Sequence, residues 1–218
     1  MRRFSIGLLA LFLSAAAPAE PAHDPTNTTE LVGALEQTYK GVTSLKADFV
    51  QVQRSAATGE VRQKGVVQLK RPRKARWEFQ GADGTTFVTD GKTIWLYTPS
   101  AKQVIETGSA AGAGGGGMGE LLDSLDKLDQ FFNLQLVEGQ DGKRSYRVIA
   151  TPKSPAQYKQ LEIVVSRKSY TVEKVVVVDQ MGGQTELTFS SVKLNSDVPD
   201  TAFTFSVPAG VQVIKGAM

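Results

Sequence analysis

The side chains that usually carry out enzyme chemistry are scarce in this sequence. It contains no cysteine and a single histidine, His23, which lies close to the N-terminus. A Ser-His-Asp or Cys-His catalytic arrangement is therefore excluded, as are metal sites of the His/Cys type. Hydrolysis by a pair of carboxylates is not excluded by the residues alone, although no pattern points to it. We predict no enzyme activity, no catalytic residue and no cofactor.

Three carboxylates could still form an oxygen-rich cation site. Asp123, Asp126 and Asp129 recur at every third residue. This spacing is typical of a helix and not of a calcium-binding loop. We interpret the three residues as part of a solvated helix face and predict no metal site.

Basic side chains gather between residues 64 and 76. The cluster consists of Lys64, Lys70, Arg71, Arg73, Lys74 and Arg76. Two interpretations stay open: a solvated face, or a surface that contacts anionic lipid headgroups or an acidic partner. The formal charge of the chain is +3, and residues 1–19 hold two arginines and no acid, which leaves +1 without them. We expect no nucleic-acid partner.

The first residues have the organisation of a secretory signal peptide. Two arginines precede an apolar stretch from Phe4 to Leu13, and Ala17-Pro18-Ala19 fits a cleavage site. The apolar stretch has about ten residues, fewer than the roughly 20 that span a bilayer, although an uncleaved anchor stays open. We predict that residues 1–19 are removed and that residues 20–218 form one exported domain. Its core must hold it together without disulfides.

Alternating apolar and polar residues predict a large β-sheet. The alternation is clear in segments 47–52, 64–70 and 75–80, and about ten or eleven strands follow this pattern, the last at 201–206. Asp90-Gly91 is a strong hairpin signal between two of them. Consecutive strands joined by short turns make an antiparallel sheet, and so long a sheet must curl.

Two segments have helical spacing instead. Asn27 and Glu30 form a capping pair for a helix that ends near Gly41. A second apolar stripe predicts one continuous helix over 118–128. The stripe consists of Met118, Leu121, Leu122, Leu125 and Leu128. It follows a glycine-rich run at 109–117, which is either a plain loop or a hinge. These helices are the available cover for the inner face of the curled sheet.

The sheet carries bulky apolar side chains on alternating positions. Phe49, Leu69, Trp77 and Phe79 belong to this set. Such side chains either fill a packed core or line a cavity beneath a loosely fitting cover, and the periodicity leaves both hypotheses open.

Five segments, in order along the chain, resemble the periplasmic outer-membrane lipoprotein carrier family, LolA. They are Asp48-Phe49-Val50-Gln51; Gly65 to Leu69 with Arg71-Pro72 and Arg76-Trp77; Asp90-Gly91-Lys92 with Trp95, Tyr97 and Pro99; Asp179-Gln180 with Gly183-Gln184-Thr185; and Phe203 and Phe205 with Pro208 and Gly210-Val211. The resemblance runs from about Leu31 to Ile214, which is nearly all of the predicted mature chain.

The resemblance implies a mainly β fold with a few helices, in which a single curved antiparallel sheet forms an incomplete β-barrel closed by a helical lid. It implies a monomeric chaperone in the periplasm of a Gram-negative bacterium. Such a protein carries lipoproteins from the inner to the outer membrane and encloses their acyl chains in an apolar cavity. The implied partners are acylated lipoproteins, an inner-membrane ABC transporter complex that loads the carrier, and an outer-membrane acceptor that empties it.

The resemblance also assigns a role to Arg71, which matches the functional arginine of the family's Arg-Pro step. Its five donors suit lid-helix carbonyls, and such bonds would hold the empty carrier shut. From the residues alone, Arg71 is also consistent with a surface arginine at a strand end. The candidate ligand-binding residues are Phe49, Val67, Leu69, Arg71, Trp77, Phe79, Met118, Leu121, Leu122 and Leu125. Two alternative functions stay open: a periplasmic regulator that senses lipid or lipoprotein, and a carrier of another amphiphile such as a glycolipid.

Overall fold

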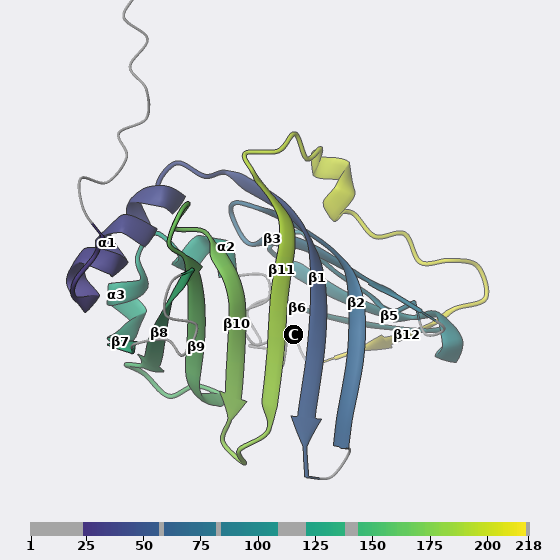
Figure 1. Ribbon diagram of the computed structural model, residues 1–218. Coiled ribbons are helices and arrows are strands. Elements are labelled where there is room, and N and C mark those ends of the chain that lie inside the picture. The colour runs from purple at the N-terminus through teal and green to yellow at the C-terminus, as the bar shows by residue number, and fades with distance from the viewer. Residues whose placement is uncertain (1–23, 57–58, 82–83, 109–120, 138–143, 217–218) are drawn as a thin grey trace, which may run out of the picture.

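A single curved sheet of twelve strands forms most of the molecule, and helices lie against its inner face (Figure 1). The computed structural model describes residues 24–56, 59–81, 84–108, 121–137 and 144–216. The predicted signal peptide, the glycine-rich run at 109–117 and Met118 lie outside these ranges. The strand order is β12-β6-β5-β4-β3-β2-β1-β11-β10-β9-β8-β7. β7 and β12 are therefore the two edges, and the barrel is not closed.

Eleven of the twelve strands form two meanders that meet at one seam. The first contains β1 (Ser44–Ser55), β2 (Gly59–Lys70), β3 (Lys74–Gln80), β4 (Thr86–Thr89), β5 (Thr93–Thr98) and β6 (Gln103–Gly108), with the short helix η1 (Pro99–Ala101) before β6. The second contains β7 (Phe132–Val137), β8 (Ser145–Pro152), β9 (Tyr158–Ser166), β10 (Val172–Asp179) and β11 (Gln184–Leu194). At the seam β1 pairs with β11, and Phe49 lies opposite Phe189. The predicted mainly β fold with an incomplete barrel is confirmed.

The first helix, α1 (Thr28–Tyr39), begins as the capping pair predicts. The Asn27 side chain accepts a hydrogen bond from the Glu30 backbone N–H at 3.0 Å, and the Glu30 carboxylate accepts one from the Asn27 amide at 2.9 Å. This exchange satisfies a backbone donor that the first helical turn cannot satisfy itself. Leu31, Leu35 and Tyr39 on one face of α1 are buried in the main core.

The predicted continuous helix over 118–128 is wrong in the described part. Residues 121–131, which we call the lid segment, form two single-turn helices, α2 (Leu121–Ser124) and α3 (Leu128–Phe131), separated by a turn. In a continuous helix the Leu122 carbonyl would accept the Asp126 N–H. Here that carbonyl accepts a hydrogen bond from the Arg71 side chain at 2.7 Å. A tertiary contact thus takes an acceptor that the helical ladder would use.

The predicted last strand at 201–206 is also wrong. Residues 195–211, which we call the strap, cross the face of the sheet opposite to the helices and contain the short helix η3 (Asp200–Phe203). Val198 and Phe203 are buried, and the Phe205 ring packs on Trp95 and Tyr97 of β5. The strap is therefore held by side chains and not by a strand ladder, which period-two alternation cannot distinguish.

The strap leads into a final strand, β12 (Gln212–Lys215), which pairs with β6 in the parallel direction. The sheet is thus mixed, and the prediction of a wholly antiparallel sheet needs this correction. An antiparallel neighbour follows from a short turn, whereas a strand that arrives after a long crossover is free to pair in parallel. The alternation pattern did not predict β12, because its two apolar residues, Val213 and Ile214, are adjacent and do not alternate with polar ones.

Candidate functional site

Arg71 follows directly after β2 and joins the sheet to the lid segment. Its Nη1 donates to Asp126 Oδ2 at 2.7 Å, and its Nη2 donates to the Leu122 carbonyl oxygen at 2.7 Å. A third contact, a longer ion pair, links its Nε to Asp123 Oδ1 at 3.8 Å. We call this set of contacts the latch. Charge-assisted hydrogen bonds of this length are the stronger class of protein hydrogen bonds.

The two aspartates of the latch lie toward Arg71 and are about three-quarters buried. The Arg71 guanidinium beside Asp126 lowers the pKa of that carboxyl below its ordinary value, against a smaller opposing effect of burial. Asp123 contributes a second link, because its Oδ2 accepts from the Arg73 backbone N–H at 2.6 Å. The interpretation of Asp123 and Asp126 as part of a solvated helix face is wrong, since it considered helical spacing without the basic cluster opposite.

The latch contains buried polar atoms that its own contacts do not satisfy. Arg71 Nε and Asp126 Oδ1 are buried and have no hydrogen-bond partner within the described ranges. An unsatisfied buried polar atom costs about 1–3 kcal/mol. The latch thus holds the lid segment in place, although two of its buried polar atoms lack a hydrogen bond to any described residue.

Beneath the latch, most predicted ligand-binding residues lie in one apolar cluster on the inner face of the sheet. Phe49, Val67, Leu69 and Trp77 are buried there, and Phe79 packs against them while remaining partly exposed. Leu122 and Leu125 of the lid segment are buried in the same cluster. Met118 and the side chain of Leu121 lie outside the described part of the structure. The side chains from sheet and lid segment therefore pack together in one apolar cluster on the inner face.

The aromatic part of this cluster depends on a glycine. The Phe49 ring meets Trp77 and Phe79 edge-on, with ring centroids 5.0 and 5.1 Å away. Phe49 lies over Gly65 of the neighbouring strand, and a Cβ added at Gly65 would be 2.8 Å from the Phe49 ring and would overlap the Glu78 carbonyl oxygen. Gly65 therefore permits this aromatic packing.

Trp77 has a polar atom that the cluster leaves unpaired. Its side chain is fully buried, and its indole N–H has no hydrogen-bond partner among the described residues. Buried tryptophan N–H groups usually find an acceptor. The aromatic cluster of Phe49, Trp77 and Phe79 therefore contains one unused donor.

The lid segment also contacts α1 and the second meander. Glu36 Oε1 of α1 accepts from the Asp129 backbone N–H at 3.3 Å, and Lys153 after β8 donates to the Asp129 carbonyl. Thr28 of α1 accepts from the Leu136 N–H of β7 at 2.9 Å. α1, α3 and β7 thus form one covered side of the inner face.

Other members of the basic cluster have internal partners. Lys70 and Lys74 both pair with Asp200 of the strap, at 2.8 and 3.1 Å. These two lysines lower the pKa of Asp200 below its ordinary value. Arg76 pairs with Glu78 at 2.7 Å. Lys70 and Lys74 therefore anchor the strap, which differs from both interpretations that the sequence left open.

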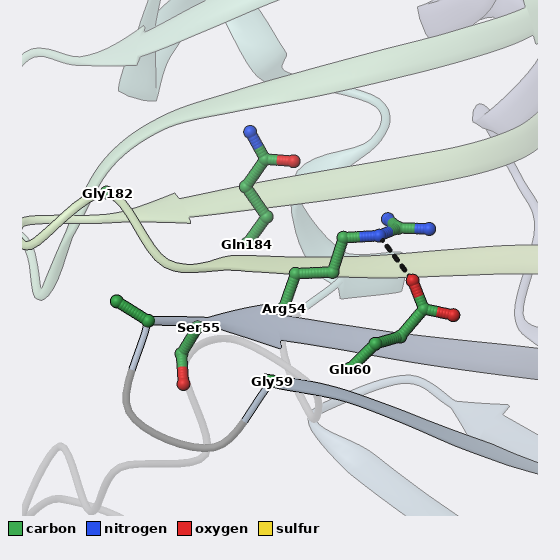
Figure 2. A pocket seen from close by; sticks show the side chains of 7 residues that line it. Arg54, Ser55, Gly59, Glu60, Gly182 and Gln184 are labelled. Atoms are coloured by element: carbon green, nitrogen blue, oxygen red, sulfur yellow. Dashed lines mark hydrogen bonds and ion pairs between the residues drawn. The ribbon is translucent and has the colours of Figure 1, made fainter.

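A separate open pocket of about 470 Å³ lies at the far end of the sheet. Residues from the β1–β2 hairpin and the β10–β11 turn line it: Arg54, Ser55, Ala56, Gly59, Glu60, Gly182 and Gln184. Figure 2 shows the Arg54 and Glu60 side chains paired beside it, at 2.9 Å. Because its cation is already paired and no predicted site residue lines it, we do not assign it a ligand.

Neither a cluster of metal-ligating side chains nor a membrane-spanning helix occurs in the described ranges. No group of three His, Cys, Asp or Glu side chains in them is placed to hold a metal ion. None of the helices in the same ranges has the length and apolar content needed to cross a bilayer. The arrangement thus places an apolar inner face beneath a short segment that Arg71 fastens to the sheet.

Comparison with known proteins gives consistent matches. The family model described as "Outer membrane lipoprotein carrier protein LolA" matches residues 40–206. The outer-membrane lipoprotein carrier protein of Hahella chejuensis is 30% identical, over 85% of this chain and 88% of its own length. That of Proteus mirabilis is 28% identical, over 94% and 93%. An uncharacterized conserved protein from Thermus thermophilus has the same fold, with a TM-score of 0.53 at 15% identity, over 86% of this chain and 98% of its own.

Proposed function

The chain belongs to the outer membrane lipoprotein carrier family, LolA, and from this membership we propose that it carries lipoproteins through the periplasm with their acyl chains against the inner face of the sheet. The family is one of carriers and not of enzymes. The observation that supports the proposal most directly is the latch: a largely apolar inner face is covered by a short segment that Arg71 fastens to the sheet.

The free energies of acyl-chain burial and of the latch allow cargo to be both taken up and released. Each buried CH₂ contributes about 0.8 kcal/mol, so one long acyl chain contributes roughly 10 kcal/mol. A charge-assisted hydrogen bond contributes about 1.5–3 kcal/mol, and less where the pair is partly exposed to water, as Arg71 is. Burial of an acyl chain can therefore displace the latch, while the latch still competes when cargo leaves.

Opening also has a cost that cargo would offset. Leu122 and Leu125 leave the apolar cluster when the lid segment moves, and a buried leucine contributes about 1.5–3 kcal/mol. Acyl chains that occupy the same place restore apolar contact for Trp77 and Phe49. The unsatisfied polar atoms of the latch lower the stability of the closed state, which favours reversible opening.

The remaining parts of the proposal concern partners and export. We infer that residues 1–19 direct export and are cleaved, and that the carrier is a monomer. An inner-membrane ABC transporter complex would load it with acylated lipoprotein, and an outer-membrane acceptor would receive the cargo. The latch supports this division, because a carrier that closes on its own after release cannot easily take the cargo back.

The two tryptophans of the chain provide a direct test. Trp95→Phe leaves Trp77, on the inner face, as the only tryptophan. A lipopeptide with brominated acyl chains should quench Trp77 fluorescence in a saturable way, since bromine quenches tryptophan only at short range. The reciprocal variant, Trp77→Phe, leaves Trp95 on the strap side and should show little quenching. Equal quenching in both variants, or none in either, would contradict enclosure of acyl chains by the inner face.

A further inference from the structure

One row of apolar side chains crosses the inner face from the seam to an open edge. Residues paired directly across neighbouring strands point to the same face of a sheet. The pairing therefore places seven side chains in one line, which we call the apolar row: Ala47, Val67, Trp77, Phe87, Leu96, Ile105 and Ile214, from β1, β2, β3, β4, β5, β6 and β12.

The exposure of the apolar row increases toward β12. Its first four members are buried, with Val67 and Trp77 fully inaccessible to water. Leu96 is half-buried. Ile105 and Ile214 are 38% and 40% exposed. Contiguous exposed apolar surface marks interaction and ligand-binding sites, and here it continues directly into the buried apolar face.

Two of the helices, α1 and α3, cover the other end of the sheet. α1 and α3 both contact β7, while β12 contacts β6 at the opposite edge. Figure 1 shows α1 and α3 beside β7 and β8 at the left of the view, with β12 on the right. The exposed end of the apolar row is therefore away from the latch and from α1.

The length of the exposed half of the row matches one acyl chain. Neighbouring strands lie about 4.8 Å apart, so the three intervals from Ile214 to Phe87 span about 14 Å. The hydrocarbon core of a bilayer is about 30 Å thick and contains two chain lengths, which gives about 15 Å for one chain. A chain laid along Ile214, Ile105 and Leu96 would thus reach the buried Phe87.

We propose that the β12 end of the apolar row is the route by which a lipoprotein acyl chain reaches the inner face. This inference rests on the function proposed above and adds a location and a direction to it. The chain first contacts Ile214 and Ile105 at the edge, then Leu96, and then displaces Leu122 and Leu125 from the buried part. The lid segment opens in response, from the side away from β7.

The edge strand offers a matched pair of variants. Ile214 and Val213 are neighbours on β12 with similar exposure, 40% and 38%, but they point to opposite faces. In the Trp95→Phe background, Ile214→Gln should slow the onset of Trp77 quenching by the brominated lipopeptide roughly fivefold. A change of this size is expected when part of one apolar contact is lost in the entry step. Val213→Gln should leave the rate unchanged.

A second variant separates the route from the integrity of β12. Ile105→Gln changes the same row on β6, which pairs on both sides, and it should slow quenching as Ile214→Gln does. Rates equal to the parent rate in both row variants, with full quenching at saturation, would overturn the route and leave the proposed function intact. Absence of saturable quenching in the parent would instead contradict the proposed function.

Molar mass by light scattering completes the test. The variants should have the same mass as the parent at every concentration used. A parent dimer that Ile214→Gln dissociates would show that this edge pairs with a second copy of the chain, and that result would also overturn the route.

Discussion

Arg71 Nη1 lies 2.7 Å from Asp126 Oδ2, and this ion pair joins the end of β2 to the turn between α2 and α3. The same arginine occupies the Leu122 carbonyl, so it both shapes the lid segment and fixes it to the sheet. One side chain thus determines both the shape of the lid segment and its attachment to the sheet. Any change at Arg71 should alter how the inner face is covered more than it alters the sheet.

Replacement of Arg71 by leucine should impair release of cargo while leaving uptake intact. Without the latch the closed state no longer competes for the inner face, so bound acyl chains stay longer. The release rate of brominated lipopeptide, measured as recovery of Trp77 fluorescence after excess detergent micelles are added, should fall. Arg73→Leu is the matched control, because the Arg73 side chain is exposed and only its backbone contacts Asp123. Release from Arg71→Leu at the parent rate would argue against the latch.

Acid should weaken the latch through Asp126. The Arg71 guanidinium lowers the pKa of this carboxyl in the folded protein, so the folded state binds a proton there less tightly than the unfolded chain. The stability from this pair is present in full above the ordinary aspartate pKa of about 3.9 and is lost as pH falls through the lower folded value. As the pH is lowered, the free energy of unfolding should therefore fall less steeply in Asp126→Asn than in the parent. Urea titrations at a series of pH values measure this. Asp129→Asn, at an exposed position, should follow the parent curve; if Asp126→Asn follows it too, the linkage is absent.

Alanine at Gly65 should destabilise the protein by about 1–3 kcal/mol, the usual cost of overpacking. The new Cβ would meet the Phe49 ring and a backbone oxygen of β3, so the strands and the aromatic group must shift. Gly33→Ala in α1 is the control with the opposite sign: nothing lies within 4 Å of its added Cβ. Because alanine favours a helix, this control should gain about 0.5–1 kcal/mol. Urea midpoints that move in the same direction in both variants would contradict the packing at Gly65.

Detachment of the strap should be visible at one tryptophan only. Phe203 is almost completely buried, and Phe203→Ala should cost about 3–5 kcal/mol. Because Phe205 of the same strap packs on Trp95, the emission of Trp95 should shift to longer wavelength in partial denaturant before that of Trp77. Val207→Ala, at an exposed strap position, should change neither. Simultaneous shifts of both tryptophans would show that strap and inner face unfold as one unit.

Local signals in the sequence predicted local structure well. Asn27 and Glu30 specify the start of α1 through their own hydrogen bonds. Asp90-Gly91 specifies a hairpin, since Asp90 Oδ1 accepts from the backbone N–H groups of Lys92 and Thr93 at 2.8 Å each. Both signals depend on residues at most three positions apart, so no knowledge of the rest of the fold is needed.

Features that depend on distant contacts were missed or misassigned. The break in the lid segment depends on Arg71, which lies 51 positions before Leu122. The strap alternates as a strand would, but Asp200 binds Lys70 and Lys74 and Phe203 is buried against the sheet. Charge complementarity could have suggested that Asp123 and Asp126 pair with a basic residue. The spacing in the sequence, however, does not indicate which cation of the basic cluster faces them.

The parallel pairing of β12 with β6 affects the order in which the molecule can be assembled. Because a protein is synthesised from its N-terminus, the strands β1 to β6 are complete long before β11 and β12 exist. Until then this first meander has unpaired backbone groups along both β1 and β6. Exposed strand edges are templates for association between chains. Nascent molecules should therefore be most prone to aggregate, and most in need of a holding chaperone, in the interval before the last fifth of the chain arrives to occupy both edges.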